Sequence, residues 1–181
     1  MGALYRYCPY CAASLAFVAI EGRDRLACHA CGEVFYENAK PCAGALVVRE
    51  GKILLGLRDR EPYRGLWDIP GGFLEAEEHP EAGAIREVKE ETGLDIHPDG
   101  LIGIYMDRYG KGNSPYTLNI FYEAHVTGGS ERPSSDLADL RWFHVEQLPW
   151  EAIAFKNAEE AIKDWFVQRK HGSFHPYSQG G

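Results

Sequence analysis

The sequence has no long hydrophobic run, and no stretch approaches the roughly 18–20 consecutive apolar residues that a membrane-spanning helix needs. Its beginning, MGALYRYCPY, also lacks the basic start and the apolar stretch of a secretory signal. Arg6 stands where an N-myristoylation signal has serine or threonine. We therefore expect a cytoplasmic protein that does not associate with membranes.

Positive charge is scarce as well, because 19 lysines and arginines face 27 aspartates and glutamates, which gives a net charge of -8. A protein that covers a phosphate backbone is normally basic, so we do not expect nucleic acid as a partner. An acidic chain is still suited to a small phosphorylated substrate held through metal ions, because the protein then supplies carboxylates. The length of 181 residues suits one ordinary domain with a small appendage.

Cysteines are few, but four of the five form two pairs with the pattern C-x2-C-x16-C-x2-C, at Cys8, Cys11, Cys28 and Cys31. In a reducing cytoplasm this spacing favours a structural zinc site, in which two tight turns present four thiolates. A disulfide pair and a redox-active dithiol are the alternatives. A closed four-thiolate site leaves no position for water, so we expect it to support the fold and not to take part in catalysis.

The segment 1–40 reads as a small zinc ribbon with a hairpin that turns near residues 22–24. Its four basic residues are balanced by four acidic ones, so the electrostatic signature of a nucleic-acid-binding ribbon is missing. We expect the ribbon to brace the rest of the chain or a homodimer interface.

The remaining chain alternates strand and helix patterns. Residues 42–59 predict two strands around a Glu50-Gly51 turn, and 65–73 predict a short extended run. Later strands are expected at 101–109, 116–126 and 140–145, and helices at about 80–92 and 157–170. For the first helix, Pro80 suits the first turn and Gly93 suits the stop. Several strands with two helices indicate an α+β or α/β sandwich.

The predicted helix after Pro80 carries an unusual concentration of acid. Glu87, Glu90 and Glu91 stand at i, i+3 and i+4, within an arc of roughly 100° around the helix. We expect Ala82, Ile85 and Val88 to pack on the other side. Like charges at this spacing repel each other, and a hard cation such as Mg2+ relieves the repulsion. A charged, solvent-exposed helix is the alternative interpretation.

A known family pattern covers this region. The chain resembles the Nudix hydrolases, whose box G-x5-E-x7-R-E-U-x-E-E-x-G-U it matches without a gap at Gly72, Glu78, Arg86, Glu87, Val88, Glu90, Glu91, Gly93 and Leu94. With its ribbon, it is similar to the group that includes NADH, ADP-ribose and FAD pyrophosphohydrolases. The resemblance implies an α+β fold, a Nudix-type α/β/α sandwich with a mixed sheet. It also implies a ribbon at 1–40, a Nudix domain at 41–170 and a flexible tail at 171–181.

The resemblance implies hydrolysis of a pyrophosphate bond in a nucleoside diphosphate linked to another moiety. Glu87 and Glu91 would be the principal ligands of Mg2+ or Mn2+, and Glu90 a ligand or the base for the attacking water. The Gly72 carbonyl is a further ligand candidate. Arg86 is placed to reach back to Glu78 and hold the preceding loop.

Substrate contacts are harder to assign. Arg58 is a candidate for a phosphate contact, and Trp67 for the wall of a base pocket or for the core. Many relatives add one acid from a loop across the cleft, for which Asp136 and Asp139 are the candidates, and we select Asp139. The S-Q-P-W-P-F-P stretch of NADH pyrophosphatases is absent, which leaves ADP-ribose, FAD and other dinucleotides open. A nucleotide-sensing regulator and an RNA-end-processing enzyme are the alternative functions.

Overall fold

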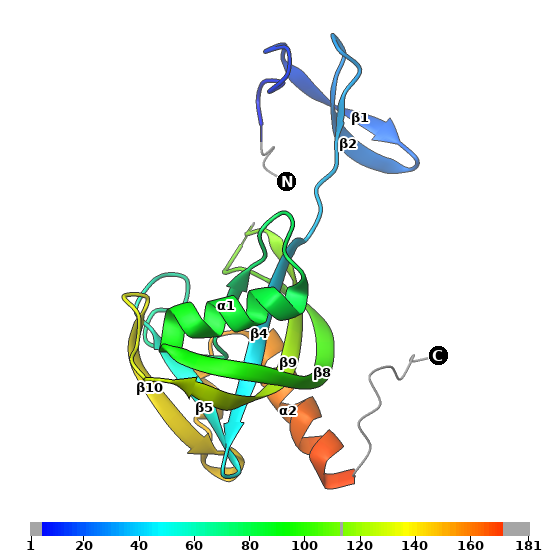
Figure 1. Ribbon diagram of the computed structural model, residues 1–181. Coiled ribbons are helices and arrows are strands. Elements are labelled where there is room, and N and C mark those ends of the chain that lie inside the picture. The colour runs from blue at the N-terminus through cyan, green and yellow to red at the C-terminus, as the bar shows by residue number, and fades with distance from the viewer. Residues whose placement is uncertain (1–4, 113, 172–181) are drawn as a thin grey trace. The chain divides into compact units, whose positions relative to one another are not determined.

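A computed structural model describes residues 5–112 and 114–171 of the chain. The chain divides between Ala39 and Lys40 into two compact units, one residue before the boundary expected from the sequence. Figure 1 shows the course of the chain and its labelled elements. Each unit contains a sheet of its own.

The first unit contains a three-stranded antiparallel sheet in the order β1-β2-β3. Its strands are β1 (Leu15–Ile20), β2 (Arg23–Cys28) and β3 (Val34–Phe35). The hairpin turns at Glu21 and Gly22, which both adopt a positive φ, 51° and 76°. The turn lies slightly earlier than predicted, because Arg23 and Asp24 pair with Ile20 and Ala19 and so belong to the second strand.

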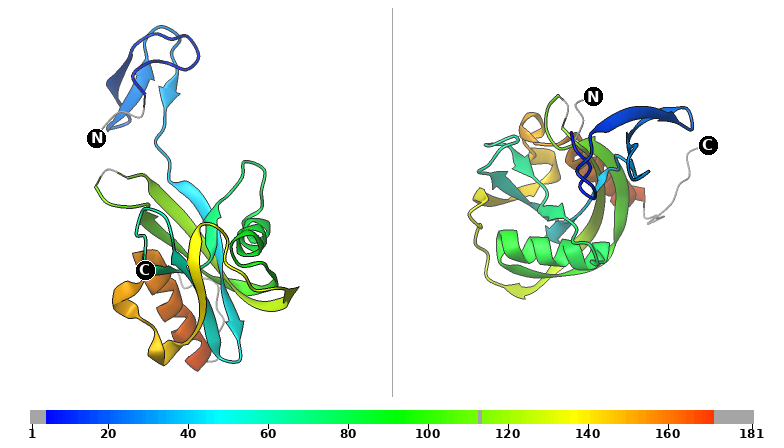
Figure 2. Two further views of the ribbon diagram at one scale, coloured as in Figure 1. Left: turned by 90° about the vertical axis from the view of Figure 1, so that its left-hand side faces the viewer. Right: turned by 90° about the horizontal axis from the view of Figure 1, so that it is seen from above.

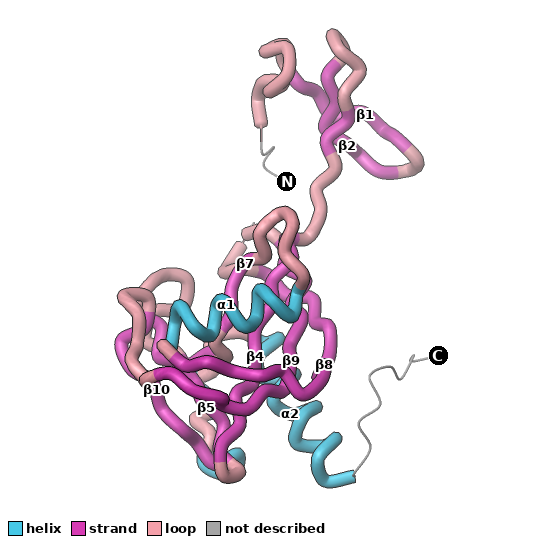
Figure 3. Tube along the Cα trace, viewed as in Figure 1, coloured by secondary structure: helices cyan, strands magenta, loops and turns pink. Residues whose placement is uncertain are grey.

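In the second unit, the described residues form a seven-stranded mixed sheet with β10-β5-β4-β9-β8 as its main order. The strands β4 and β9 pair in parallel, and the other pairings are antiparallel. This arrangement confirms the predicted α+β class with a mixed sheet. Figure 3 colours these elements by type. The elements are β4 (Lys40–Arg49), β5 (Lys52–Arg58), β6 (Trp67–Asp68), β7 (Gly71–Phe73), α1 (Pro80–Thr92), β8 (Leu94–Arg108), β9 (Tyr116–Gly129), β10 (Leu137–His144), η1 (Val145–Gln147), η2 (Trp150–Ala152) and α2 (Lys156–His171).

The central strands are buried on both faces, which explains their nearly continuous apolar sequence. Along β4, Leu46 packs in the core cluster that contains α2, whereas its neighbours Ala45 and Val47 pack in the cluster that contains α1. Successive side chains of a strand point to opposite faces, so the two helices cover opposite sides of the sheet (Figure 2). Each fully buried aliphatic side chain contributes about 1.5–3 kcal/mol.

The helix α1 begins and ends as predicted. Pro80 occupies the first turn, and Gly93 ends the helix in the left-handed conformation at a φ of 74°. His79 is the N-cap, and its Nδ1 accepts a hydrogen bond from the Glu81 backbone N–H at 3.3 Å. The imidazole thereby satisfies one of the free N–H groups at the helix start, as a serine or threonine would do there.

The predicted packing face of α1 was partly wrong. Ala82 and Ile85 are exposed, and the buried residues are Gly83, Ala84, Val88 and Thr92. Glu91 follows Ala84 by seven residues, which places it only about 20° away around the helix. Glu91 therefore flanks the buried face of the helix and does not lie opposite to it.

The helix α2 covers the other face of the sheet through an apolar side. Ala158, Ile162 and Trp165 are buried there, and Phe166 is partly buried against the same cluster. The helix extends to His171, and the remainder of the predicted tail lies outside the described residues. Among the described residues, no helix combines the length and apolar character that crossing a membrane would require.

Candidate active site

A cavity of about 420 Å³ lies where α1 and the Gly71-Gly72 strand meet the central sheet. Its lining residues come from segments of the second unit that are far apart in sequence. They are Cys42, Ala43, Arg58, Arg60, Asp68, Ile69, Gly71, Gly72, Phe73, Glu75, Arg86, Glu87, Glu90, Glu91, Tyr109, Thr117, Asn119, Phe121, Ser134, Asp136, Phe155 and Asn157. The volume is in the range of pockets that hold small-molecule ligands, roughly 300–1,000 Å³.

Arg86 joins three of the acids near this cavity. Its Nε and Nη2 donate to the two oxygens of Glu78, both at 2.7 Å. Its Nη1 donates to Glu87 at 2.7 Å and to Glu90 at 3.2 Å. The hydrogen bonds from Arg86 lower the pKa of Glu78 to about 2 and raise the pKa of the guanidinium itself. The loop before α1 is thus tied to the helix by a bidentate, charge-assisted pair.

Gly72 provides the space that Glu87 occupies. A Cβ atom at Gly72 would lie 2.6 Å from the carboxylate carbon and oxygens of Glu87, closer than real Cβ contacts allow. Gly83, in the preceding turn of α1, has a similar role, because a Cβ there would collide with Leu74 and approach Glu78. The glycines at these two positions therefore allow a close approach between backbone and side chains.

Glu91 is the most buried of the three predicted metal ligands. Its Oε2 accepts a hydrogen bond from the Gly71 N–H at 3.1 Å. Burial, together with the neighbouring carboxyls of Asp68 and Glu87, raises the pKa of Glu91 to about 8. Burial likewise raises the pKa of Glu87, although Arg86 opposes this shift. The cavity thus holds carboxyl groups whose negative charge is unfavourable without a cation.

Asp68 is a cavity residue that sequence reasoning missed. Burial raises its pKa to about 7, against the lowering effect of Arg58, whose Nη1 lies 3.2 Å from the Asp68 carboxylate. Arg58 also donates from Nε to the Pro62 carbonyl at 2.9 Å. Its buried Nη2 has no hydrogen-bond partner among the described residues. One donor of this cavity-lining arginine is therefore available to a ligand.

Glu90 differs from the other two glutamates because 59% of its side chain is exposed to solvent. All three line the same cavity, but they do not form a compact ligand set. Among the described residues, only two groups bring three or more metal-ligating atoms within 4.8 Å of one another, and neither contains a glutamate. The three predicted glutamates therefore line one cavity, but their carboxylate oxygens do not all lie within 4.8 Å of one another.

Three aromatic rings that also line the cavity form an aromatic wall. The ring of Tyr109 lies 5.3 Å from that of Phe73 and 5.8 Å from that of Phe155, the latter nearly parallel. The buried polar residues Asn119 and Asn157 also line the space. None of these aromatic and asparagine residues was selected from the sequence. Most of these residues lie far from the Nudix box in the sequence. Phe73 lies inside the box, but at a position where the box allows any residue. No local sequence pattern could therefore have indicated them.

Two predicted substrate residues do not line the cavity. Trp67 is 8% exposed and packs in the core, with its ring edge-on to Phe143 at 5.0 Å. Asp139 is partly exposed and pairs with Arg141 at 3.0 Å. The other acid of that loop, Asp136, lines the cavity and forms an ion pair with Arg60. An irregularity in the β10 pairing between Leu137 and Asp139 separates the two aspartates.

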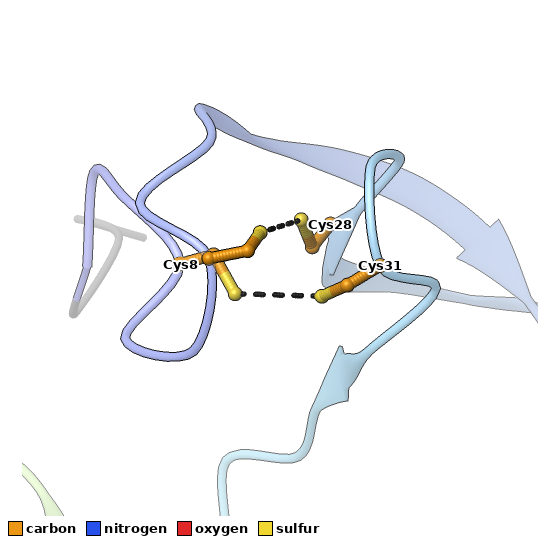
Figure 4. A group of neighbouring side chains, drawn as sticks. Cys8, Cys28 and Cys31 are labelled. Carbon is orange, nitrogen blue, oxygen red and sulfur yellow. Dashed lines mark hydrogen bonds between the residues drawn. The ribbon is translucent and has the colours of Figure 1, made fainter.

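In the first unit, the ligand atoms of the four paired cysteines lie within 4.8 Å of one another; Figure 4 labels Cys8, Cys28 and Cys31. The Sγ atoms of Cys8 and Cys31 are 3.6 Å apart, and those of Cys11 and Cys28 are 3.4 Å apart. A disulfide requires about 2.05 Å, whereas four sulfurs around zinc, each at about 2.3 Å, lie roughly 3.8 Å from one another. The two cysteines of each C-x2-C motif sit on one tight turn. The Ala12 N–H donates to the Cys8 carbonyl in the first turn, and the Gly32 N–H donates to the Cys28 carbonyl in the second. The donor set fits zinc.

Known proteins share both the sequence and the fold. A family model described as the NUDIX domain matches residues 39–166. An ADP-ribose pyrophosphatase of Methanocaldococcus jannaschii is 34% identical over 139 residues, which make up 76% of this chain and 78% of the relative. An NAD-capped RNA hydrolase NudC of Stutzerimonas stutzeri is 32% identical over 146 residues, covering 80% of this chain and 50% of the relative. This chain therefore spans about half the length of that relative.

A solved structure extends the likeness to nearly the whole chain. The crystal structure of a NUDIX hydrolase from Nitrosomonas europaea superimposes with a TM-score of 0.83 at 27% sequence identity, covering 96% of this chain and 97% of that one. The family model alone accounts for well over half of the sequence. The intact box at residues 72–94, the mixed sheet and the cavity beside α1 agree with this match. The chain belongs to the Nudix family of hydrolases.

Proposed function

We propose that this Nudix hydrolase uses a divalent cation to split the pyrophosphate of a nucleoside diphosphate linked to another moiety, with ADP-ribose as the leading substrate. The observation that supports this most directly is the composition of the cavity. Its lining combines the carboxyl groups of Glu87, Glu90 and Glu91 with the rings of the aromatic wall. A nucleotide carries both phosphates and a base, and so matches this combination.

The acidic side fits Mg2+ or Mn2+. The donors are hard carboxylate oxygens, which these ions prefer. Burial of Glu91 raises its pKa to about 8 and burial of Asp68 raises its pKa to about 7, so added positive charge would stabilise the ionised forms. When bound, the metal neutralises the pyrophosphate and activates water. The Gly72 carbonyl is a further oxygen donor beside Glu87.

We assign distinct roles to the residues around this position. Glu87 and Glu91 hold the cation, since both are largely enclosed beside the glycine strand. Glu90 is more exposed, and we assign it the role of accepting a proton from the attacking water or of contributing a ligand. Arg86 fixes Glu78 and positions Glu87 and Glu90 through hydrogen bonds of 2.7–3.2 Å. The Nη2 of Arg58 is a donor for a phosphate oxygen.

The substrate assignment rests on sequence. The relative named an ADP-ribose pyrophosphatase aligns over 76% of this chain, and the S-Q-P-W-P-F-P stretch of NADH pyrophosphatases is absent. The test is a substrate panel of ADP-ribose, NADH, FAD, diadenosine polyphosphates and nucleoside triphosphates, with Mg2+ or Mn2+, and products identified by mass. We expect AMP and ribose 5-phosphate from ADP-ribose, with loss of turnover in Glu90→Gln. Equal turnover without any divalent cation would overturn the proposal.

A second candidate function follows from the NudC relatives. Several NAD-capped RNA hydrolases match this chain. One of them is 32% identical over a region that covers 80% of this chain and 50% of the relative. The net charge of -8 argues against an extended RNA contact. Binding and decapping of a short NAD-capped RNA, measured over a salt series, separates the two functions. Capped RNA hydrolysed faster than free ADP-ribose would favour the RNA substrate, whereas nucleotide binding without hydrolysis would favour a sensor.

A further inference from the structure

Besides the four cysteines, another group of potential metal ligands lies on the surface of the second unit, outside the cavity lining. His97 on β8 and His125 on β9 are directly paired across the antiparallel ladder. Their ring centroids are 5.4 Å apart. Both side chains are more than half exposed, so they lie on the solvent side of the sheet. Residues paired in this way have Cβ atoms about 4.5–5.5 Å apart, a spacing at which two imidazoles can share one ion.

Asp99 completes the group. His125 Nδ1 lies 2.8 Å and 3.0 Å from the two Asp99 oxygens, and His97 Nδ1 lies 3.7 Å from Oδ1. A tetrahedral ion with bonds of about 2.0–2.1 Å places its ligands roughly 3.3–3.5 Å apart, between these values. The ligand atoms of all three residues lie within 4.8 Å of one another. Small rotations of exposed side chains suffice to reach the coordinating geometry.

The backbone holds these residues in place. Pro98 lies between His97 and Asp99 and is buried, so residues 97 and 99 point to the same, outer face. The β8–β9 pairing is irregular between Pro98 and Gly100, and the fixed φ of proline limits the freedom of this short stretch. Among the described residues, no lysine or arginine nitrogen lies within 4.0 Å of the Asp99 carboxylate. The groups within that distance that can carry positive charge are the two histidines.

We propose that His97, Asp99 and His125 form a surface site for a borderline transition metal, with Zn2+ as the representative ion. Two imidazoles and one carboxylate suit zinc, copper or nickel and do not suit Mg2+, which prefers oxygen ligands. None of these three residues belongs to the cysteine group, and none lines the acidic cavity, so the proposed site is a separate one. With three protein ligands, water completes the coordination and the ion exchanges readily.

An ion at this site would join the edge strand β8 to its neighbour β9. In the described sheet, β8 is the last strand and pairs with β9 alone. An ion bound to His97 and Asp99 on one strand and His125 on the other joins the two strands. Because it binds the folded chain, it raises the unfolding temperature as its concentration rises above its dissociation constant.

The test is zinc titration of the full chain whose cysteine site is already loaded, in excess Mg2+ so that the acidic cavity is occupied. We expect the wild type to bind one additional zinc ion by calorimetry and elemental analysis, with a rise in melting temperature. His97→Ala and His125→Ala should each weaken this binding at least tenfold, since removing even an outer-shell partner costs about 10–100-fold. Asp99→Asn should weaken it in the same way.

His144→Ala is the matched control, because His144 is also exposed on a strand of the same unit but belongs to neither metal-ligating group. It should bind zinc as the wild type does. Circular dichroism of each variant verifies the fold, and the tail histidines are unchanged in all of them. Absence of additional zinc in the wild type would overturn the proposal, as would unchanged binding in both His97→Ala and His125→Ala.

Discussion

The guanidinium of Arg86 contacts both carboxylate oxygens of Glu78 at 2.7 Å, across a separation of eight residues. This fork connects the loop that follows the glycine strand to the middle of α1. The same guanidinium also reaches Glu87. The Arg86 side chain therefore both holds the loop through Glu78 and positions Glu87, a proposed metal ligand.

Arg86→Lys should lower both stability and turnover. Lysine cannot form the bidentate pair, because its ammonium is a single point donor. We expect a loss of about 1–2 kcal/mol in the free energy of unfolding, at the low end for charged hydrogen bonds because the arginine is partly exposed. Urea denaturation measures this loss. Lys89→Gln, which removes an exposed pair with Asp95, should cost less than about 0.5 kcal/mol. Equal effects of the two changes would contradict this role for Arg86.

Gly72→Ala should reduce activity more than stability. The added Cβ would lie 2.6 Å from the Glu87 carboxylate and push it aside. A displacement of about 1 Å at a catalytic group can cost roughly 100-fold in rate, so we expect a fall in kcat of that order. Gly128→Ala is the control, since its Cβ would meet Asp95 at an ordinary 3.4 Å. Steady-state kinetics and thermal melting on both variants decide the question, and full activity in Gly72→Ala would refute the close packing.

Without a divalent metal, stability should fall as pH rises towards 8. Burial raises the pKa of Glu91 to about 8, above its ordinary value of about 4.3 in the unfolded chain. Between these two values the folded state binds more protons than the unfolded state, so the free energy of unfolding decreases with rising pH. Melting temperatures measured in magnesium-free buffer check this slope, which Glu91→Gln should flatten.

The same group makes metal binding depend on pH. Because a bound cation needs the ionised carboxylate, Mg2+ affinity should fall as pH drops below about 8, and binding should release a proton. Calorimetry in buffers of different ionisation enthalpy measures this release. An identical proton count for Glu91→Gln and the wild type would rule out Glu91 as its source.

Tyr109→Leu should weaken substrate binding while leaving the chemistry largely intact. The ring belongs to the aromatic wall with Phe73 and Phe155, and stacking against a base contributes about 1–3 kcal/mol. We expect KM for ADP-ribose to rise about tenfold, which corresponds to about 1.4 kcal/mol, with little change in kcat. Tyr105→Phe is the control, because Tyr105 hydrogen-bonds Asp164 and does not line the cavity. A change confined to kcat would argue against a stacking role.

Cys28→Ser should abolish zinc binding at the ribbon and destabilise the first unit. The four sulfurs surround one position, and small metal-bound units usually lose their fold with the metal. Elemental analysis and proteolysis of residues 1–39 measure these losses. The residual hydrolase activity should keep the same dependence on Mg2+. A variant that keeps its ribbon folded but loses only the chemical step would give the cysteines a catalytic role.

The local features of the fold could be predicted because they depend on neighbouring residues. Proline at the start and glycine at the end set the limits of α1, and the Glu50-Gly51 turn joins β4 to β5. The spacing of Glu87 and Glu91 likewise places both carboxyls on one side of a helix. The helix orientation was harder, since Ala82 and Ile85 are apolar yet face solvent.

The sequence by itself indicated the acidic site that we propose, because the box at residues 72–94 and the spacing within one short helix limit which acids lie on the same side. The composition of the cavity around them was decided only by the tertiary structure. The presence of Asp136, and not Asp139, in the cavity lining depends on contacts between distant segments, as do the burial of Trp67 in the core and the position of Asp68 and Phe155 beside the acids. Strand register and burial set such contacts, and neither is encoded in the spacing of a local motif.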